Sequence, residues 1–257
     1  MANSSSPIGV FDSRVGGLSV LREIRTLLPD QDLVYLADSA HCPYGGKRRE
    51  EIVERARAIT RFLVEQQAAK IVVVACNTAT VAAVEELRAS FQLPIVGMEP
   101  GVKPATAASR TGVVGVLATR VTLDGSRFAR LVERYADGVK VITQPCPGLV
   151  EQVERGDLTS QDLVNTYVRR LIAQKADTLV LGCTHYSFLK GLIAHAAGPG
   201  VALIDTGPAV ARQVMRVLPR RALSGSGTIR VFSTSETTRE VIQRLWGERL
   251  DVTVTCV

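Results

Sequence analysis

The length, composition and charge of the chain indicate a globular protein, with no feature typical of a membrane protein or a nucleic-acid-binding protein. Its 257 residues suffice for one large core or two compact α/β lobes, and 46% hydrophobic with 22% charged residues is ordinary for this class. No apolar run approaches the roughly 20 residues of a membrane-spanning helix. The net charge of +6 comes from basic residues mixed with acidic ones, without a basic tail or an aromatic platform, so we expect no nucleic-acid partner.

The N-terminus and the cysteines indicate a cytoplasmic protein without metal or disulfides. The first residues, MANSSSP, include neither a basic segment nor an apolar stretch, so the sequence predicts no secretory signal. Five scattered cysteines argue against a disulfide framework. Without a CxxC pair, and with three histidines in all, the sequence also predicts no zinc site.

In the first part of the chain, short apolar runs alternate with helical patterns. A first strand, PIGVFD, runs into a turn with two adjacent glycines, and amides of such a turn can hold an anion. An equally good explanation of this turn is an ordinary strand-to-helix connection. We expect strands at residues 7–12, 33–37, 70–76 and 93–98, and helices at 18–28, 49–67 and 80–90.

The rest of the chain repeats the alternation. We expect strands at residues 111–117, 139–143, 177–183, 202–205 and 229–233, and helices at 123–135, from 149, at 160–174, after 183 and at 207–217, with a loop at 220–227. Strands that alternate with helices indicate an α/β fold with mostly parallel sheets flanked by helices. We predict two pseudo-symmetric lobes, one formed by residues 1–98 plus 208–257 and the other by residues 99–207.

Two similar stretches suggest where a site lies. KIVVVACNTAT (70–80) and DTLVLGCTHYS (177–187) are each an apolar run that ends at a cysteine, followed by small polar residues. Continuous apolar runs are typical of strands buried on both faces of a sheet. Ligands of such sheets bind beyond the carboxyl ends of the strands, where Cys76 and Cys183 fall. The sequence therefore predicts an active site in the cleft between the lobes, with one thiol from each.

An ordered set of motifs along nearly the whole chain resembles the glutamate racemases, a cofactor-independent family that supplies D-glutamate for peptidoglycan. The pair ACNTAT and GCTHY is the most specific part. Aspartate racemases are similar in plan but typically have Thr-Glu after the second cysteine, so Thr184-His185 favours glutamate. The matching segments are IGVFDSRVGGLSVLREI, ADSAHCPYGGK, VACNTAT, GMEPGVKPA, GVLAT, CPGLVEQVERG, LGCTHY and LIDTG.

The chain departs from the family pattern at three places. Arg14 stands where the family usually has glycine, His41-Cys42 replaces what is more often Arg and an aliphatic residue, and Ser187-Phe188 replaces the usual Pro-Leu. None of these changes removes a reacting group. They bear on the rate of turnover and on the fit of the substrate.

The resemblance implies a racemase, an isomerase of the cell-wall and cell-shape pathway, that works by a two-base mechanism. One thiolate removes the α-proton while a thiol on the opposite face donates another, and the roles of Cys76 and Cys183 swap with direction. From spacing alone, two buried structural cysteines would explain the pair as well. The family pattern further implies that Asp12, His185 and Glu154 assist, although Glu151 lies close enough in the same helix to compete with Glu154.

Several polar residues are implied as substrate ligands by the same motifs. Hydroxyls, amides and backbone N–H groups can bind two carboxylates without leaving a buried charge unpaired. Asp38 matches a carboxylate that the family uses near the first thiol, with a simple loop cap as its alternative. The expected substrate-binding residues are Asp12, Ser13, Asp38, Tyr44, Gly45, Asn77, Thr78, Thr184 and His185.

The sequence leaves other functions open. We expect no cofactor, because no nucleotide-binding fingerprint appears and a thiol pair makes pyridoxal phosphate unnecessary. The alternatives are a racemase of another acidic amino acid such as aspartate, a homologue that binds but turns over poorly, and a thiol-redox protein. Glutamate is the expected small-molecule partner, and many members of the family are homodimers.

Overall fold

The computed structural model describes residues 6–218 and 225–257, and its chain forms two compact units. Unit 1 comprises Met1–Met98 and Gly207–Val257, and unit 2 comprises Glu99–Thr206. Gly207, which the sequence-based division assigned to the second lobe, lies in unit 1. The loop expected at 220–227 falls partly outside the described residues.

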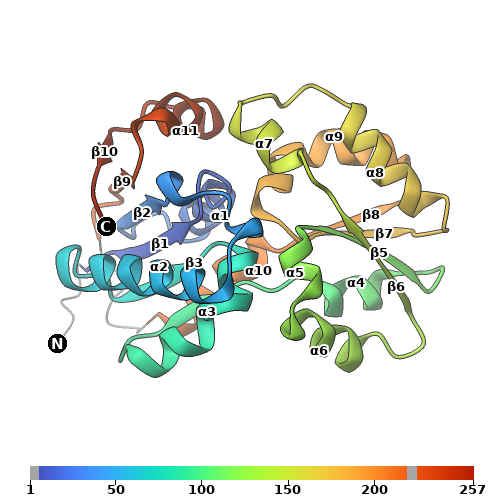
Figure 1. The fold of residues 1–257 in the computed structure, drawn as a ribbon, viewed down its shortest axis with the longest axis horizontal. Helices are drawn as coiled ribbons and strands as arrows, with labels where there is room; N and C mark the ends of the chain where they lie inside the picture. Colours follow the sequence, from blue (N-terminus) through green and yellow to red (C-terminus); the bar gives the residue numbers. More distant parts are fainter. Residues whose placement is uncertain (1–5, 219–224) are drawn as a thin grey trace. The chain divides into compact units, whose positions relative to one another are not determined.

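Unit 1 is built on a six-stranded parallel sheet in the order β10-β9-β2-β1-β3-β4 (Figure 1). Residues of β1, β2 and β3 are buried along their whole length, as their continuous apolar sequences predict. The strands are β1 (Ile8–Asp12), β2 (Leu33–Ala37), β3 (Ile71–Val74), β4 (Ile95–Gly97), β9 (Ile229–Ser233) and β10 (Val252–Val254).

Helices cover both faces of this sheet. One face carries Phe11, Val34 and Leu36, which pack with residues of α2 and α3 in one core cluster. The opposite face carries Tyr35, whose hydroxyl donates to the carbonyl of Arg14 just before α1. The helices are α1 (Leu18–Leu27), α2 (Arg49–Arg61), α3 (Asn77–Ser90), α10 (Gly207–Val217) and α11 (Arg239–Trp246).

Unit 2 is a smaller version of the same architecture. Its four-stranded sheet is parallel throughout, in the order β6-β5-β7-β8, with α8 and α9 over one face and α4 and α6 over the other (Figure 1). The strands are β5 (Val113–Ala118), β6 (Lys140–Pro145), β7 (Thr178–Leu181) and β8 (Ala202–Asp205). The helices are α4 (Val102–Ala108), α5 (Arg120–Asp124), α6 (Ser126–Tyr135), α7 (Leu149–Glu154), α8 (Asp162–Ile172) and α9 (Lys190–Ala197).

The predicted fold class, α/β lobes with parallel sheets flanked by helices, is confirmed, and several element boundaries differ. Helix α3 begins at Asn77 rather than near residue 80, because Cys76 caps it. The helix expected at 123–135 is interrupted at Gly125, whose backbone is extended. Helix α4, which begins directly after Gly101, was not predicted; it contains Pro104 in its first turn, where proline is tolerated. Elements α11 and β10 also lie outside the predictions.

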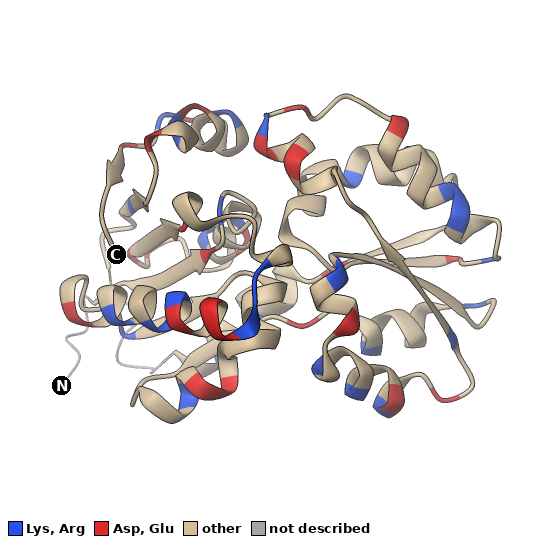
Figure 2. Cartoon of the chain, in the orientation of Figure 1, with Lys and Arg blue, Asp and Glu red and all other residues tan. Residues whose placement is uncertain are grey.

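The charged residues of the surface are mixed in sign. In Figure 2 the ribbon of α2 carries both acidic (red) and basic (blue) positions along its length. Arg48, the residue before α2, forms an ion pair with Glu51 at 2.7 Å, and Arg49, the first residue of α2, forms one with Glu86 at 2.5 Å. Among the described residues, no helix is long and apolar enough to cross a membrane, and no group of three or more His, Cys, Asp or Glu side chains could hold a metal ion.

Candidate active site

In unit 1, three of the predicted site residues follow neighbouring strands of the sheet. Asp12 ends β1, Asp38 follows β2 and Cys76 lies two residues beyond β3. The backbone continues the pairing past the strand ends, because the Asp38 amide donates to the Asp12 carbonyl at 3.0 Å. Parallel strands end at the same edge, so these three residues gather at one edge of the sheet.

The Cys76 thiol lies at the N-terminus of α3 and is 5% exposed. Its sulfur accepts a hydrogen bond from the Ala79 amide at 3.4 Å, an interaction that stabilises negative charge on sulfur together with the positive end of the helix. The thiol also contacts the Ser13 hydroxyl at 3.7 Å. Ser13 in turn donates to Asp12 Oδ1 through its amide (2.6 Å) and its hydroxyl (3.1 Å). A chain of polar contacts therefore runs from Cys76 to Asp12.

The side chain of Asn77 is buried without a protein partner. It is 3% exposed, and neither its Oδ1 nor its Nδ2 makes a hydrogen bond in the described structure. Leaving a buried amide unsatisfied costs about 1–3 kcal/mol for each polar group, so this side chain keeps a donor and an acceptor available. Asn77 directly follows Cys76 at the start of α3.

In unit 2, Cys183 belongs to a second polar chain. The residue lies two positions beyond β7, is 8% exposed and precedes a short 3₁₀ helix (Thr184–Leu189). Its sulfur is 3.7 Å from Nδ1 of His185, and Nε2 of His185 is 2.5 Å from Oε1 of Glu154 at the end of α7. All three side chains are buried.

The electrostatics of this trio favour an imidazolium. Burial by itself lowers the pKa of His185, but hydrogen bonds to Cys183 and Glu154 outweigh it and hold the pKa well above its usual value. Glu151, the other candidate on the same helix, is exposed. The geometry therefore places Glu154, not Glu151, next to His185.

A third buried thiol, Cys146, lies in unit 2 and has a different character. Burial and the nearby Cys183 raise the pKa of Cys146 far above that of a free thiol. Its sulfur donates to the Gln144 carbonyl at 3.1 Å, and its own carbonyl accepts from Tyr186 at 3.3 Å. Because reactivity follows the thiolate, a cysteine held in the neutral form is a poor nucleophile and a poor base.

The remaining predicted ligands fall into the same two units. Ser13, Thr78 and Thr184 are buried near the cysteine or aspartate that precedes them in sequence. Gly45 is half-buried on a 3₁₀ turn (Tyr44–Gly46). Tyr44 and Asp38 contact each other, and that contact extends to three residues that sequence reasoning missed, Arg55, Thr234 and Val257. No local pattern marks these three, because their partners are 17 or more positions away in the chain.

The three departures from the family pattern have defined surroundings. Arg14 does not have a positive φ, so its backbone conformation does not require glycine. His41 contacts Asp38 Oδ1 at 2.9 Å, and Cys42 is half-buried and free of disulfides. Ser187 donates to Asp205 Oδ1 at 3.1 Å, while Phe188 is half-buried.

Comparison with known proteins identifies the family of this chain. Residues 8–214 match the model of the Asp/Glu/Hydantoin racemase family, and the chain belongs to this family of isomerases. The similar proteins described below are glutamate racemases, which confirms the resemblance inferred from ACNTAT and GCTHY.

Three comparisons support this placement. The chain is 54% identical over 256 residues to the glutamate racemase of Stutzerimonas stutzeri, covering 96% of this chain and 97% of that one. It is 58% identical over 215 residues to that of Herpetosiphon aurantiacus, covering 82% and 84%. The structure of Escherichia coli glutamate racemase in complex with L-glutamate and the activator UDP-MurNAc-ala has a TM-score of 0.87 at 34% identity, covering 98% and 99%.

Proposed function

We propose that the protein interconverts L- and D-glutamate by moving the α-proton between two thiols, Cys76 and Cys183, without a cofactor. The observation that carries this proposal is that each thiol lies beyond a buried parallel strand next to its own acid–base group. Cys76 is connected to Asp12 through Ser13, and Cys183 contacts His185, which contacts Glu154.

In one direction, Cys76 as a thiolate accepts the α-proton from one face of the carbon. The Ala79 amide and the N-terminus of α3 stabilise this thiolate before the reaction. Asp12, fixed by Ser13, is placed to receive the substrate ammonium or to orient the thiol. The thiol form of Cys183 then donates its proton to the opposite face, and the two roles reverse in the other direction.

On the Cys183 side, His185 has two tasks. As an imidazolium paired with Glu154, it stabilises the thiolate that forms when Cys183 gives up its proton. It also offsets the negative charge that builds up on the substrate carboxylate as the carbanion forms. Glu154 fixes the ring and keeps it charged.

Binding of glutamate uses neutral donors on both units. The unsatisfied amide of Asn77 supplies both a donor and an acceptor next to Cys76. The other groups in our proposal are the hydroxyls of Ser13, Thr78 and Thr184 and the main-chain amides of Tyr44 and Gly45.

We further propose that the D-glutamate serves peptidoglycan synthesis in the cytoplasm and that the protein functions as a homodimer. The support is the similarity to the glutamate racemases. These statements are tested by D-glutamate dependence of a strain that lacks the gene, and by the mass of the purified protein in solution.

The catalytic proposal is tested with L-glutamate in deuterated water, under reductant and without added cofactor. Decay of the circular dichroism signal together with deuterium at the α-carbon is the expected result. Cys76→Ala and Cys183→Ala should abolish both signals, while Cys146→Ala, which removes a buried thiol outside the proposed chemistry, should keep them. Silence with glutamate but turnover of aspartate would change the substrate, and silence with both would refute the racemase.

A further inference from the structure

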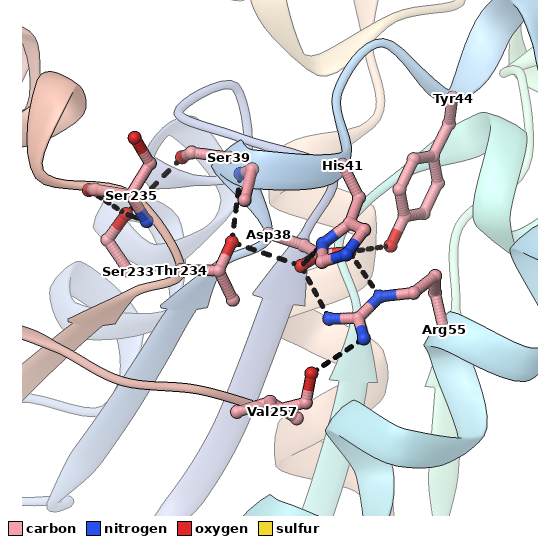
Figure 3. Close-up of polar contacts among 10 residues, drawn as sticks. Asp38, Ser39, His41, Tyr44, Arg55, Ser233, Thr234, Ser235 and Val257 are labelled. Carbon is pink, nitrogen blue, oxygen red and sulfur yellow. Dashed lines mark hydrogen bonds and ion pairs between the residues drawn. The ribbon is translucent and has the colours of Figure 1, made fainter.

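The Asp38 carboxylate is completely buried at the end of β2 and is surrounded by donors from four parts of unit 1 (Figure 3). Oδ2 accepts from the Tyr44 hydroxyl at 2.6 Å and from Arg55 Nε at 3.1 Å. Oδ1 contacts Arg55 Nη2 at 2.8 Å, His41 Nδ1 at 2.9 Å and the Thr234 hydroxyl at 3.2 Å.

These contacts leave Asp38 no capacity for a ligand. An ionised carboxylate offers about four lone-pair sites, and five donor atoms already face them. Burial tends to raise the pKa of Asp38, but hydrogen bonds from Arg55 and Tyr44 together with the Arg55 charge hold it below its usual value. The group is therefore an anion whose charge is paired with Arg55 and whose acceptor sites are already occupied.

Arg55 extends the network to the last residue of the chain. Its side chain is 17% exposed, and all three guanidinium nitrogens donate hydrogen bonds. Nε and Nη2 form a bidentate contact with the Asp38 carboxylate, while Nη1 donates to the main-chain oxygen of Val257 at 2.6 Å. Thr234, which follows β9, donates to Asp38 and accepts from the Ala40 amide at 2.9 Å. The turn after β2 is thus tied to α2, to the loop after β9 and to Val257.

Tyr44 connects this hydrogen-bond network to the proposed substrate ligands. It is 1% exposed, and burial together with the Asp38 charge raises the pKa of Tyr44, so the phenol stays protonated and donates to Asp38. A hydroxyl engaged in this way fixes the ring. The fixed ring in turn fixes the 3₁₀ turn Tyr44–Gly46, whose main-chain groups are among the proposed ligands.

We propose that Asp38 and Arg55 are positioning residues, which hold the Tyr44–Gly46 turn in the conformation that binds glutamate and do not themselves touch it. This inference rests on the proposed function and replaces the direct binding role that the sequence suggested for Asp38. It also predicts that residues far from the thiols in sequence, Arg55 and Thr234, influence the affinity for substrate.

The experiment is steady-state kinetics of the full-length protein in both directions. Because the network serves binding, Arg55→Gln and Asp38→Asn should each raise KM about tenfold and change kcat less than about threefold, with Arg55→Lys in between. The double variant should resemble either single variant, because the two residues act as one unit. Tyr44→Phe, which removes one contact and keeps the ring, should raise KM in the same sense.

Asp32 offers a matched control at the other end of the same strand. It directly precedes β2 and accepts hydrogen bonds from Ser226 and Thr228, at 2.9 Å and 2.6 Å from their hydroxyls. Asp32→Asn should lower the melting temperature and leave KM unchanged.

Two results would overturn the inference while leaving the racemase intact. If the Asp38 and Arg55 variants lose thermal stability like Asp32→Asn with unchanged KM, the network is structural only. If Asp38→Asn loses kcat/KM while Arg55→Gln and Tyr44→Phe behave as wild type, Asp38 contacts the substrate itself. Absence of glutamate turnover by the wild-type protein would instead refute the proposed function, and this inference with it.

Discussion

Nε2 of His185 lies 2.5 Å from Oε1 of Glu154, and both side chains are buried in unit 2. The same imidazole turns Nδ1 toward the Cys183 sulfur at 3.7 Å. One ring therefore connects a carboxylate to a thiol, and each of the two partners favours the protonated ring.

Removing the Glu154 charge should change both the rate and its pH dependence. In Glu154→Gln the pKa of His185 should fall, because the substitution replaces the negatively charged Glu154, which raises this pKa, with a neutral amide. The imidazolium is then lost at lower pH, so the alkaline limb of the kcat profile should move to lower pH and kcat at neutral pH should fall about tenfold. Glu151→Gln, an exposed change on the same helix, should match the wild type. An unshifted profile in Glu154→Gln would contradict this role.

Asn77 should matter for binding but not for stability. Because its amide has no hydrogen-bond partner among the described residues, Asn77→Ala should leave the melting temperature nearly unchanged and raise the KM for glutamate by about tenfold or more. Thr80→Val, on the same helix, should lower the melting temperature and leave the KM for glutamate unchanged. Its hydroxyl donates to the Val74 carbonyl and accepts from the Met98 amide, so stability falls while KM stays the same. Calorimetry and kinetics separate the two; a marked loss of stability in Asn77→Ala would argue against a ligand role.

Gly17 is required for space beside Asp12. A Cβ at this position would lie 2.7 Å from Asp12 Cβ and 3.1 Å from Tyr35 Cε2, although its φ of −63° suits any residue. Gly17→Ala should displace Asp12 and lower kcat/KM by about tenfold or more, since small misplacements of catalytic groups are costly. Gly191→Ala in α9, where a Cβ meets nothing within 4 Å, should stabilise the protein by about 0.5–1 kcal/mol without changing kinetics. Equal activity of both variants would disprove the steric argument.

Asp177 should make unit 2 sensitive to acid. Burial opposes ionisation, but hydrogen bonds from Ser109 Oγ and the amides of Arg110 and Thr111 lower the pKa of Asp177 to about 2. A lowered pKa stabilises the fold above the unfolded value near 3.8, and this stabilisation is lost as pH falls toward 2. Asp177→Asn should therefore cost about 1 kcal/mol at pH 7, a difference that narrows in acid, as thermal unfolding at several pH values would show. A difference independent of pH would contradict this explanation.

The sequence predicted the parts of the structure that depend on local pattern. The buried strands and the cysteines after β3 and β7 follow from apolar runs that end in small polar residues. Contacts between distant segments could not be read in this way: Arg55 and Val257 lie 202 positions apart, and no periodicity connects them. The choice between Glu151 and Glu154 as the partner of His185 also needed the structure, because both lie on the same helix and only Glu154 is buried. The shared cleft and the proposed roles of the site residues stay predictions.

The two thiols are supported by unlike means: Cys76 by the amide end of a regular helix, Cys183 by an ionisable ring. Enantiomers have equal free energies in water, so the equilibrium constant of racemisation is unity and kcat/KM must be the same in both directions. If the groups that stabilise Cys76 and Cys183 make the two thiols differ in reactivity, the difference can appear only as unequal kcat values for the two directions. The KM values must then differ in the same ratio. Under the proposed mechanism, this asymmetry of the thiols sets the rate at which each enantiomer is processed at saturation, while the equilibrium favours neither enantiomer.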